Sequence, residues 1–408
     1  MKYYLLVILA CVPDILLSQG ISGDWKSASS DGFTARYGLT CTVVEGKIYV
    51  IGGHTNSGAC NILEIYDPLT DTWTTPETSG TFTPRYGLTS AVIGGKIYVM
   101  GGENFAQSPP NLNTLEVFDP ANSTWSTPST PGVFTGRAWL TSAVVADKIY
   151  VIGGGVEASN TATNIVEVYD PANNRWSTPS TTGTFSARWG LCSAVIADRI
   201  YVFGGYAHGA LATIEVFDPA TNHWSAVSTS GTFTPRNESS ACVLNGLVYI
   251  SGGEDANGNA IDSVDVFDPS TNSWSTLAAN GKFVSRQALA SASVGGKLYA
   301  MGGLDNHTPI LNDNQVFTPL PSEVESHGIM MDPVSLSPNP ATSCFTISNI
   351  SSNVTKVLIM DVLGKTVSEV RNIRTSDVTL DLSSLATGTY YFRLISPNSV
   401  ITRILVKD

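Results

Sequence analysis

Short runs of alternating apolar and polar residues recur along most of the chain, and turn-forming residues separate them. The segment Leu88–Gly102 contains two such runs, joined at Gly94-Gly95, a dipeptide that favours a tight β-hairpin turn. A third run, residues 114–118, ends at Asp119-Pro120, where we expect a type I turn stabilised by the aspartate side chain. A fourth short run surrounds Trp125. The pattern therefore predicts four antiparallel strands in one unit of about 50 residues.

This four-strand unit occurs six times. An arginine recurs at intervals of 48 to 52 residues, and a glycine pair always begins sixteen residues after it. An aromatic-Asp-Pro triplet and then a tryptophan complete five units, whereas the sixth has Phe317-Thr318-Pro319 and no tryptophan. The six arginines are Arg36, Arg85, Arg137, Arg188, Arg236 and Arg286, and the five tryptophans are Trp73, Trp125, Trp176, Trp224 and Trp274. Identical sheets that each need the same tryptophan favour an all-β, six-bladed β-propeller over a sandwich.

The missing sixth tryptophan has a counterpart near the other end of the chain. Trp25 precedes Arg36 by eleven residues, and twelve residues separate each other tryptophan from the next arginine. We therefore expect a strand around Trp25 to complete blade six, so that the closed ring leaves no free sheet edge at that point. The arginine, glycine pair, aromatic-Asp-Pro and tryptophan motifs together resemble the kelch repeat over residues 21–318. That resemblance implies a six-bladed kelch-type propeller.

The composition agrees with a turn-rich β protein and limits its partners. Only 14% of the 408 residues are charged, 42% are hydrophobic, and the chain contains 37 glycines and 21 prolines. The net charge of −12 opposes binding to nucleic acid or to an anionic membrane surface. The cysteine spacing shows no disulfide framework, so free thiols are expected.

Residues 1–20 have the features of a secretory signal peptide. Lys2 precedes an apolar run that Pro13 and Asp14 interrupt, and small residues follow, so cleavage after Ser18 or after Gly20 fits equally well. The uninterrupted apolar length that a membrane-spanning anchor requires is absent. The resulting protein is expected to be secreted and not to span the membrane.

The chain after the repeats has a different character. Residues 319–332 are irregular and suit a linker, and residues 333–408 alternate short strands with turns, as in a small β-sandwich. Pro338-Asn339-Pro340, the segment Asp361–Lys365, Gly388-x-Tyr390 and the terminal Lys407 resemble the type A sorting domain of the type IX secretion system. The resemblance implies a Bacteroidetes-type bacterium, contact of residues 333–408 with that secretion machinery, and removal of the domain at the cell surface. An ordinary accessory sandwich, which could itself bind carbohydrate, is the alternative.

Loop lengths distinguish the two faces of the predicted propeller. From the glycine pair to the aspartate position the separation varies from 14 to 18 residues, whereas the turns on the opposite face keep their length. Rigid scaffolds commonly present function on such variable loops, so this face is the candidate site. The loops are His54–Asn61, Glu103–Asn113, Gly155–Asn164, Tyr206–Ala212, Glu254–Asp262 and Leu304–Asn314.

Positions that break the sixfold symmetry are the candidate ligand-binding residues. A residue present in all blades, such as the arginines, serves the scaffold, with anion binding by the arginines as the alternative. The candidates follow the arginines or the glycine pairs, and they are Tyr37, Tyr86, Trp139, Trp189, His54, Glu103, Tyr206 and Glu254. Exposed tyrosines and tryptophans would stack on sugar rings or peptide side chains, and acidic groups would supply hydrogen bonds. Packing of the same aromatics between blades is the alternative.

Three other chemistries deserve mention. The oxygen-rich segment Asp255–Asp262 has part of a calcium-loop pattern but lacks its terminal glutamate, so a polar turn is expected. Copper radical oxidases are kelch relatives, yet His54, His208, His307 and Cys60 are scattered over three blades. A sialic-acid epimerase relative would use arginine and glutamate from loops. We therefore expect no cofactor and no metal, and a non-catalytic propeller that binds an extracellular glycan or protein, with a carbohydrate-active enzyme as the alternative.

Overall fold

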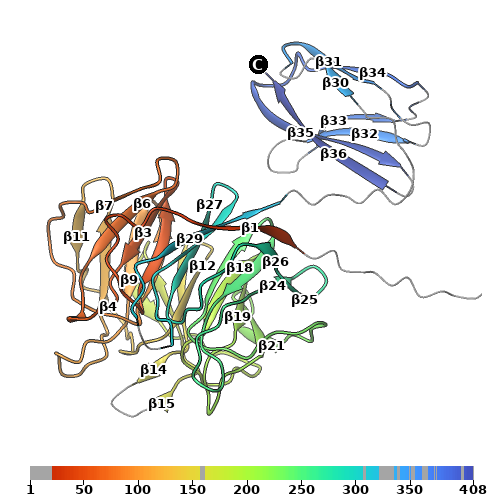
Figure 1. The fold of residues 1–408 in the computed structure, drawn as a ribbon. Helices are drawn as coiled ribbons and strands as arrows, with labels where there is room; N and C mark the ends of the chain where they lie inside the picture. Colours follow the sequence, from red (N-terminus) through yellow and green to blue (C-terminus); the bar gives the residue numbers. More distant parts are fainter. Residues whose placement is uncertain are drawn as a thin grey trace, which may run out of the picture. The chain divides into compact units, whose positions relative to one another are not determined.

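The computed structural model describes residues 21–156, 161–306 and 309–320 of the propeller region. In the C-terminal region it describes residues 335–337, 341–348, 350, 354–360, 366–371, 373, 375–396 and 399–407. The expected signal peptide and most of the expected linker lie outside these ranges. The chain divides into two compact units, residues 1–322 and 323–408. Every regular element in the described ranges is a β-strand, so the all-β fold class is confirmed (Figure 1).

Five blades of the first unit are four-stranded antiparallel sheets whose strands follow one another in chain order. Blade one contains β2 (Thr40–Val44), β3 (Lys47–Ile51), β6 (Leu63–Asp67) and β7 (Thr72–Thr74). Blade two contains β8 (Thr89–Ile93), β9 (Lys96–Met100), β10 (Leu115–Asp119) and β11 (Thr124–Ser126). Blade three contains β12 (Thr141–Val145), β13 (Lys148–Ile152), β16 (Val166–Asp170) and β17 (Arg175–Ser177). Blade four contains β18 (Cys192–Ile196), β19 (Arg199–Phe203), β20 (Ile214–Asp218) and β21 (His223–Ala226). Blade five contains β22 (Ser240–Leu244), β23 (Leu247–Ser251), β24 (Val264–Asp268) and β25 (Ser273–Thr276).

Blade six joins the two ends of the propeller. Its strands are β27 (Ala290–Val294), β28 (Lys297–Met301), β29 (Asn314–Pro319), β1 (Ser22–Ser27) and β26 (Ala278–Asn280). β1 pairs antiparallel with β29, so that Trp25 lies opposite Phe317, and β26 adds to β1 as a parallel edge strand (Figure 1). The Trp25 ring packs between Phe283 and Phe317, at centroid distances of 4.9 and 5.3 Å. The first strand of the described chain is therefore built into the last blade.

Turn chemistry explains how each blade begins. In all six blades, both central residues of the turn between the first two strands have a positive φ, as a type I′ hairpin requires. The turn pairs are Glu45-Gly46, Gly94-Gly95, Ala146-Asp147, Ala197-Asp198, Asn245-Gly246 and Gly295-Gly296. The aspartates of the Asp-Pro triplets accept a hydrogen bond from the backbone N–H two residues on, at 2.8 to 3.1 Å. Both turn predictions are confirmed.

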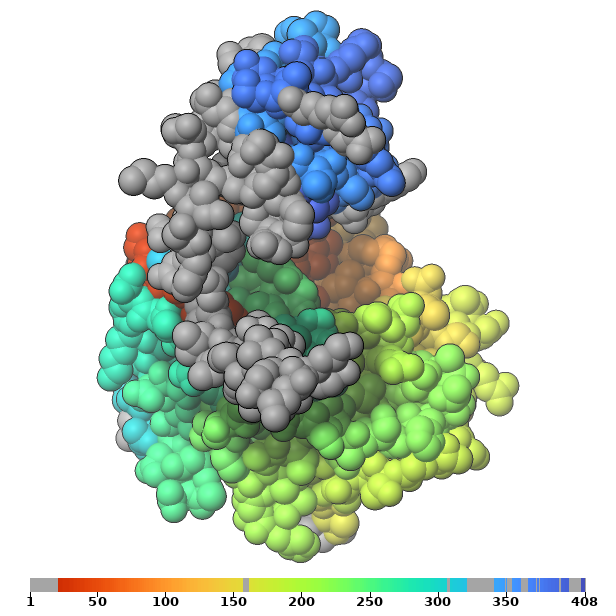
Figure 2. Space-filling view, turned by 90° about the vertical axis from the view of Figure 1, so that its right-hand side faces the viewer, coloured from red at the N-terminus to blue at the C-terminus, as the bar shows by residue number. Residues whose placement is uncertain are grey.

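The repeated aromatics form the contacts within each blade. In each of the first five repeats, the phenylalanine stacks on the tryptophan that ends that repeat, with ring centroids 4.2 to 4.6 Å apart. The pairs are Phe33–Trp73, Phe82–Trp125, Phe134–Trp176, Phe185–Trp224 and Phe233–Trp274, and Phe283 meets Trp25 in the sixth. Side chains of neighbouring blades form a continuous surface where the yellow-green and green regions adjoin (Figure 2).

The six arginines are scaffold residues. Each is completely buried, each guanidinium lies 4.7 to 5.5 Å from the ring centre of the phenylalanine three residues before it, and each pairs with one carboxylate. The partners are Glu64, Glu116, Glu167, Glu215, Asp265 and Asp313. The scaffold prediction is confirmed, and the alternative of anion binding by these arginines is wrong, because their charges are already paired inside the blades.

The glycine pairs connect the blades. The second glycine of each pair donates its N–H to the arginine carbonyl of the next blade, as Gly53 does to Arg85 at 2.9 Å. The first glycine approaches the same carbonyl so closely that a Cβ atom on Gly52 would lie 2.8 Å from the Arg85 oxygen. A side chain is therefore excluded at this position, which is why the pair recurs in every blade.

The second unit is a small β-sandwich. One sheet contains β30 (Ser335–Ser337), β31 (Cys344–Ser348) and β34 (Val378–Asp381), and the other contains β33 (Thr366–Arg371), β32 (Lys356–Met360), β35 (Gly388–Ser396) and β36 (Ser399–Lys407). Phe345 and Leu380 of the first sheet share one buried cluster with Val357, Phe392 and Leu405 of the second. This unit therefore has its own core, as the sequence predicted.

Candidate functional site

A ring of backbone hydrogen bonds surrounds the axis of the propeller. The residue two positions after each arginine donates its N–H to the carbonyl of the equivalent residue in the preceding blade, at 2.7 to 2.8 Å, and the sixth such bond closes the circle. All six residues adopt a left-handed backbone conformation, with φ from +53° to +64°. The residues of this axial ring are Gly38, Gly87, Trp139, Gly190, Glu238 and Ala288.

Only three members of the axial ring are glycines. The left-handed conformation costs an ordinary residue about 1–2 kcal/mol relative to its right-handed form, and glycine escapes this cost. Trp139 and Glu238 adopt the left-handed conformation although both have large side chains. Strain of this kind concentrates at functional sites, where the surrounding structure holds the residue in place. The ring therefore marks Trp139 and Glu238 as candidates for function.

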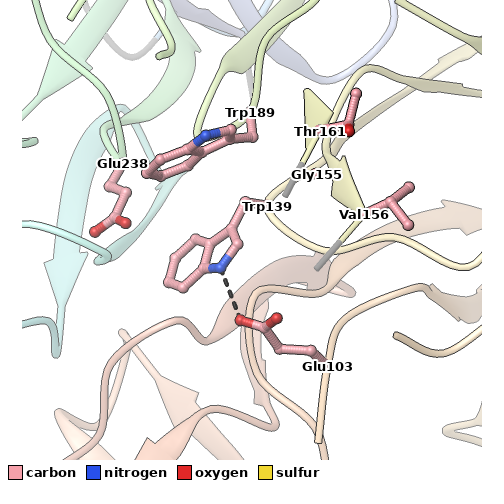
Figure 3. A pocket seen from close by; sticks show the side chains of 7 residues that line it. All are labelled: Glu103, Trp139, Gly155, Val156, Thr161, Trp189 and Glu238. Atoms are coloured by element: carbon pink, nitrogen blue, oxygen red, sulfur yellow. Dashed lines mark hydrogen bonds between the residues drawn. The ribbon is translucent and has the colours of Figure 1, made fainter. Parts of the chain in front are cut away.

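Both residues line a cavity of about 160 Å³. Its wall consists of Glu103, Trp139, Gly155, Val156, Thr161, Trp189 and Glu238. Figure 3 shows the two indoles near each other, with Glu238 on one side and the β14–β15 hairpin on the other. Strand β14 (Gly155–Val156) and strand β15 (Thr161–Ala162) belong to the variable loop of blade three. A similar small hairpin, β4 (His54–Thr55) and β5 (Gly58–Ala59), lies in the variable loop of blade one.

Negative charge dominates this cavity. Protein atoms enclose the Glu238 carboxyl although it keeps some contact with solvent, and this burial, together with the charges of Glu254 and Glu103, raises the pKa of Glu238 to about 8. Burial and the charges of Glu238 and Glu103 raise the pKa of Tyr37. Glu103 accepts a hydrogen bond from Trp139 Nε1 at 2.9 Å (Figure 3). The seven lining residues include no lysine or arginine to balance these carboxylates.

The structure pairs the two kinds of symmetry-breaking position within each blade. The residue after the arginine forms a two-way backbone bridge with the residue after the glycine pair. The bridges among predicted residues are Tyr37 with His54, Tyr86 with Glu103, and Trp189 with Tyr206, and Glu254 pairs with Asn237. Asn237 Nδ2 also donates to Glu254 Oε2 at 2.9 Å. Adjacent positions in one blade can therefore act on the same ligand.

One group of aromatic rings is packed together. The rings of Tyr37 and Tyr86 lie 5.0 and 4.9 Å from the imidazole of His54, and Tyr86 also lies 5.9 Å from Trp139 and 6.4 Å from Phe105. Tyr86 is only 8% exposed and Glu103 only 4%. The expectation that Tyr86 is an exposed stacking residue is wrong, because neighbouring loop side chains cover it. Tyr86 packs against His54 and Trp139 instead of facing solvent.

The second group offers more surface. Trp189 is half-buried and lies 5.0 Å from Tyr206, which is 37% exposed. Trp139, Trp189 and Glu103 line the cavity, whereas Tyr37, Tyr86, His54, Tyr206 and Glu254 are not among its lining residues. The structure therefore brings three of the predicted residues into one cavity and places the others around it.

Sequence reasoning missed Glu238. The signal that could have found it was the alignment of the positions two residues after the arginines, where a tryptophan, a glutamate and an alanine replace glycine. That comparison singles out Trp139 and Glu238 together.

A second cavity of about 180 Å³ lies on the propeller axis. Its lining residues are those three, four and five positions after the six arginines, so every blade contributes its first strand. Threonine and serine hydroxyls of neighbouring blades bond to one another there, for example Thr89 with Ser142 at 2.7 Å. Cys41 and Cys192 are also in this wall, and burial raises the pKa of both thiols, that of Cys192 to about 11. Thiols of this kind are unreactive at neutral pH.

The residues considered for calcium and copper binding lie on loops of several different blades. Asp255 accepts hydrogen bonds from the backbone N–H groups of Asn257 and Asn259, both at 2.8 Å, so the segment forms the expected polar turn. His54 and His208 belong to blades one and four, and His307 lies outside the described residues. The cysteines in the described ranges, Cys60 among them, are free, as expected.

A six-bladed ring of antiparallel sheets, five of them four-stranded and the sixth extended by the edge strand β26, with variable loops over one end of its axis, defines a β-propeller of the kelch type. The chain belongs to the kelch-repeat family, since residues 13–154 and 139–324 match the KLHDC2/KLHL20/DRC7 Kelch-repeats domain. Residues 335–408 match the Secretion system C-terminal sorting domain. The sorting domain implies a secreted or cell-surface protein that interacts with secretion machinery. In the part of the chain that the structure describes, no helix is long and apolar enough to cross a membrane.

Several curated proteins are similar to part of this chain. The chain is 31% identical over 188 residues to the Rab9 effector protein with kelch motifs of Xenopus laevis, which covers 43% of this chain and 51% of that protein. The Bos taurus protein of the same name is 32% identical over 188 residues, covering 45% and 37%. Kelch-like protein 36 of Bos taurus is 29% identical over 168 residues, covering 40% and 26%. The chain thus spans about half or less of the length of these relatives.

Proposed function

We propose that this chain is a secreted or surface-displayed kelch propeller that binds an extracellular glycan through the cavity on its variable-loop face, without catalysis. The observation that carries the proposal is the cavity itself, where two indoles and two carboxylates meet beside the axial ring. Indoles stack on the apolar faces of sugar rings, and carboxylates accept hydrogen bonds from hydroxyl groups. A protein ligand that inserts one side chain is the other class of partner.

The proposal also assigns the parts of the chain. Residues 1–20 would direct export, residues 21–318 would form the ligand-binding propeller, and residues 319–332 would link it to the sorting domain. Residues 333–408 would engage the type IX secretion machinery and then be removed.

A glycan array tests the binding function. The chain from residue 21 onward should bind one family of glycans, and Trp189→Ala should lose most of that binding because an indole face is removed. Asp198→Asn changes an exposed turn of the opposite face and should bind like the unaltered protein. Equal binding by folded Trp189→Ala protein, or an array with no binder, would contradict the proposed site.

A carbohydrate-active enzyme is the second candidate, and Glu238 is the observation that favours it. A carboxyl with a pKa of about 8 is largely protonated at neutral pH, as a general acid in glycoside cleavage must be. After long incubation with oligosaccharides, mass spectrometry would detect cleavage, and NMR spectroscopy would detect isomerisation. Product formation that Glu238→Gln abolishes would favour the enzyme, and intact oligosaccharide would favour the binding protein.

A further inference from the structure

Two acceptors in and beside the cavity have no donor. Among the described residues, none donates a hydrogen bond to the Glu238 carboxyl or forms a salt bridge with it, and its pKa is set by burial and by two other carboxylates. Asn237, next to it in the chain, is 1% exposed, and its Oδ1 atom also has no hydrogen-bond donor. A buried acceptor without a donor costs free energy, so a ligand that supplies a donor there recovers that free energy when it binds.

The charges restrict the kind of donor. Glu103 and Glu254 are the charges that raise the pKa of Glu238. The charge of Glu238 in turn contributes to the raised pKa of the Tyr37 hydroxyl. All four groups are acidic, and the lining residues contribute no positive side chain. A neutral hydroxyl would satisfy one acceptor but leave the repulsion between carboxylates. A cation that enters the cavity would favour the ionised form of Glu238, so that this carboxyl loses its proton to solvent as the cation binds, and the cation would offset the repulsion among the carboxylates.

The indoles restrict the shape of that cation. Trp139 and Trp189 lie near each other in the cavity, and indole faces attract both cations and the C–H groups of a sugar ring (Figure 3). At about 160 Å³, the cavity is smaller than the roughly 300 Å³ or more of pockets that enclose whole drug-sized ligands, so it admits one residue of a larger chain. A rigid ring that carries an amine uses both indole faces, whereas a thin lysine side chain would lose much rotamer freedom and cover less of them.

We propose that the cavity binds a glycan through the ammonium group of a non-acetylated amino sugar, with Glu238 as its anionic partner and Trp139 and Trp189 stacking on the ring. This inference rests on the proposed function, because it takes the ligand to be a glycan. It assigns a role to the strained backbone of the axial ring: Glu238 is held in the left-handed conformation at the place where the carboxylate meets the ammonium group.

Two oligosaccharides of equal length provide the test, the glucosamine tetramer and the N-acetylglucosamine tetramer. They differ in whether the amine is charged or acetylated, and titration calorimetry measures their affinity for the chain from residue 21 to 408. The free amine should bind at least about tenfold more tightly than the acetylated form, which corresponds to one charge-assisted hydrogen bond. Glu238→Gln should remove this preference.

The matched control is Glu45→Gln. This control makes the same substitution at a second glutamate with a left-handed backbone. Glu45, however, is exposed in a turn of the opposite face. Glu45→Gln should keep the full preference for the free amine. Thermal melting of both variants shows whether each is folded. If Glu238→Gln does not fold, the preference of the unaltered protein, measured with and without a competing quaternary ammonium ion, still decides the question.

The outcomes separate the two proposals. Equal binding of both tetramers would overturn the amino-sugar inference and leave the glycan site in place. Binding of neither tetramer by a protein that binds other glycans on an array would do the same. Tight binding of a tetralysine peptide that Glu238→Gln abolishes, without binding of the glucosamine tetramer, would overturn the inference and also the proposed glycan ligand, in favour of a basic protein segment.

Discussion

Replacing Glu238 by glycine should make the propeller more stable. The left-handed backbone at φ of +53° costs a residue with a side chain about 1 kcal/mol or more, and glycine removes this cost. The substitution also removes a carboxyl whose pKa is raised to about 8 by burial and by Glu254 and Glu103. The gain should therefore consist of a backbone part that is independent of pH and a charge part that depends on it.

The sign of the charge part follows from linkage. The folded protein holds the Glu238 proton up to about pH 8, whereas the unfolded chain releases it near the ordinary value of 4.5. The unfolded state therefore binds fewer protons between these values, and the stability of the unaltered protein falls as pH rises from about 4.5 to 8. A tenfold difference in proton affinity between the two states corresponds to about 1.4 kcal/mol, and contact of the carboxyl with solvent reduces the effect, so we expect a loss of roughly 2–4 kcal/mol.

Urea unfolding followed by tryptophan fluorescence measures both parts. All eight tryptophans lie between residues 25 and 274, so the signal reports the propeller and not the sorting domain. Glu238→Gly should gain about 1 kcal/mol at pH 4.5 and roughly 3 kcal/mol or more at pH 8.5. Ala288→Gly is the matched control, because Ala288 occupies the same ring position without a charge and should gain about 1 kcal/mol at both values. A destabilised Glu238→Gly protein, or a gain that does not grow with pH, would refute the reasoning.

Further predictions concern the scaffold, the site and export. Trp25→Ala should destabilise the propeller by about 3–5 kcal/mol in the same urea assay, because a buried indole at the ring closure is lost, and a change below about 1 kcal/mol would contradict the closure. Glu116→Gln should cost about 3 kcal/mol, since it leaves the buried Arg85 unpaired, and an unchanged midpoint would show that the pair is dispensable. Tyr86→Ala should lower stability more than affinity because Tyr86 is buried, whereas Trp189→Ala should weaken glycan binding by about 1–3 kcal/mol in calorimetry with little effect on melting. The intact mass of the extracellular protein should correspond to a chain that begins near residue 19 or 21 and lacks most of residues 334–408, and a full-length species outside the cell would exclude this processing.

Much of the fold could be predicted because its determinants are local and repeated. A dipeptide such as Gly94-Gly95 dictates its own hairpin, and an Asp-Pro pair dictates its own turn. The tryptophans and phenylalanines recur once in each repeat because every blade buries the same stacked pair. The repetition supplies five or six observations of each rule in one chain.

The site could be predicted only in part, because its details depend on contacts between loops that do not repeat. Phe105 belongs to the variable loop of blade two and helps to cover Tyr86, so no property of Tyr86 itself reveals that it is buried. The importance of Glu238 depends on the axial ring, which brings together residues of all blades. In the sequence, the only sign of this position is that Glu238 stands where three other blades have glycine. The acidic partners of the arginines, such as Glu116 for Arg85, were missed because they lie far away in the chain, 31 residues in that case.

Hydrogen–deuterium exchange with and without a bound oligosaccharide tests the central claim that the variable-loop face is the ligand site. The experiment uses the chain from residue 21 to 408 and the glycan that binds most tightly on the array. Protection should concentrate in the loops 103–113, 155–164 and 206–212 and around Trp139 and Glu238, while the hairpin turns of the opposite face, such as Ala197-Asp198, exchange as in the free protein. Protection confined to those turns or to the sorting domain, with unchanged exchange in the loops, would contradict the account.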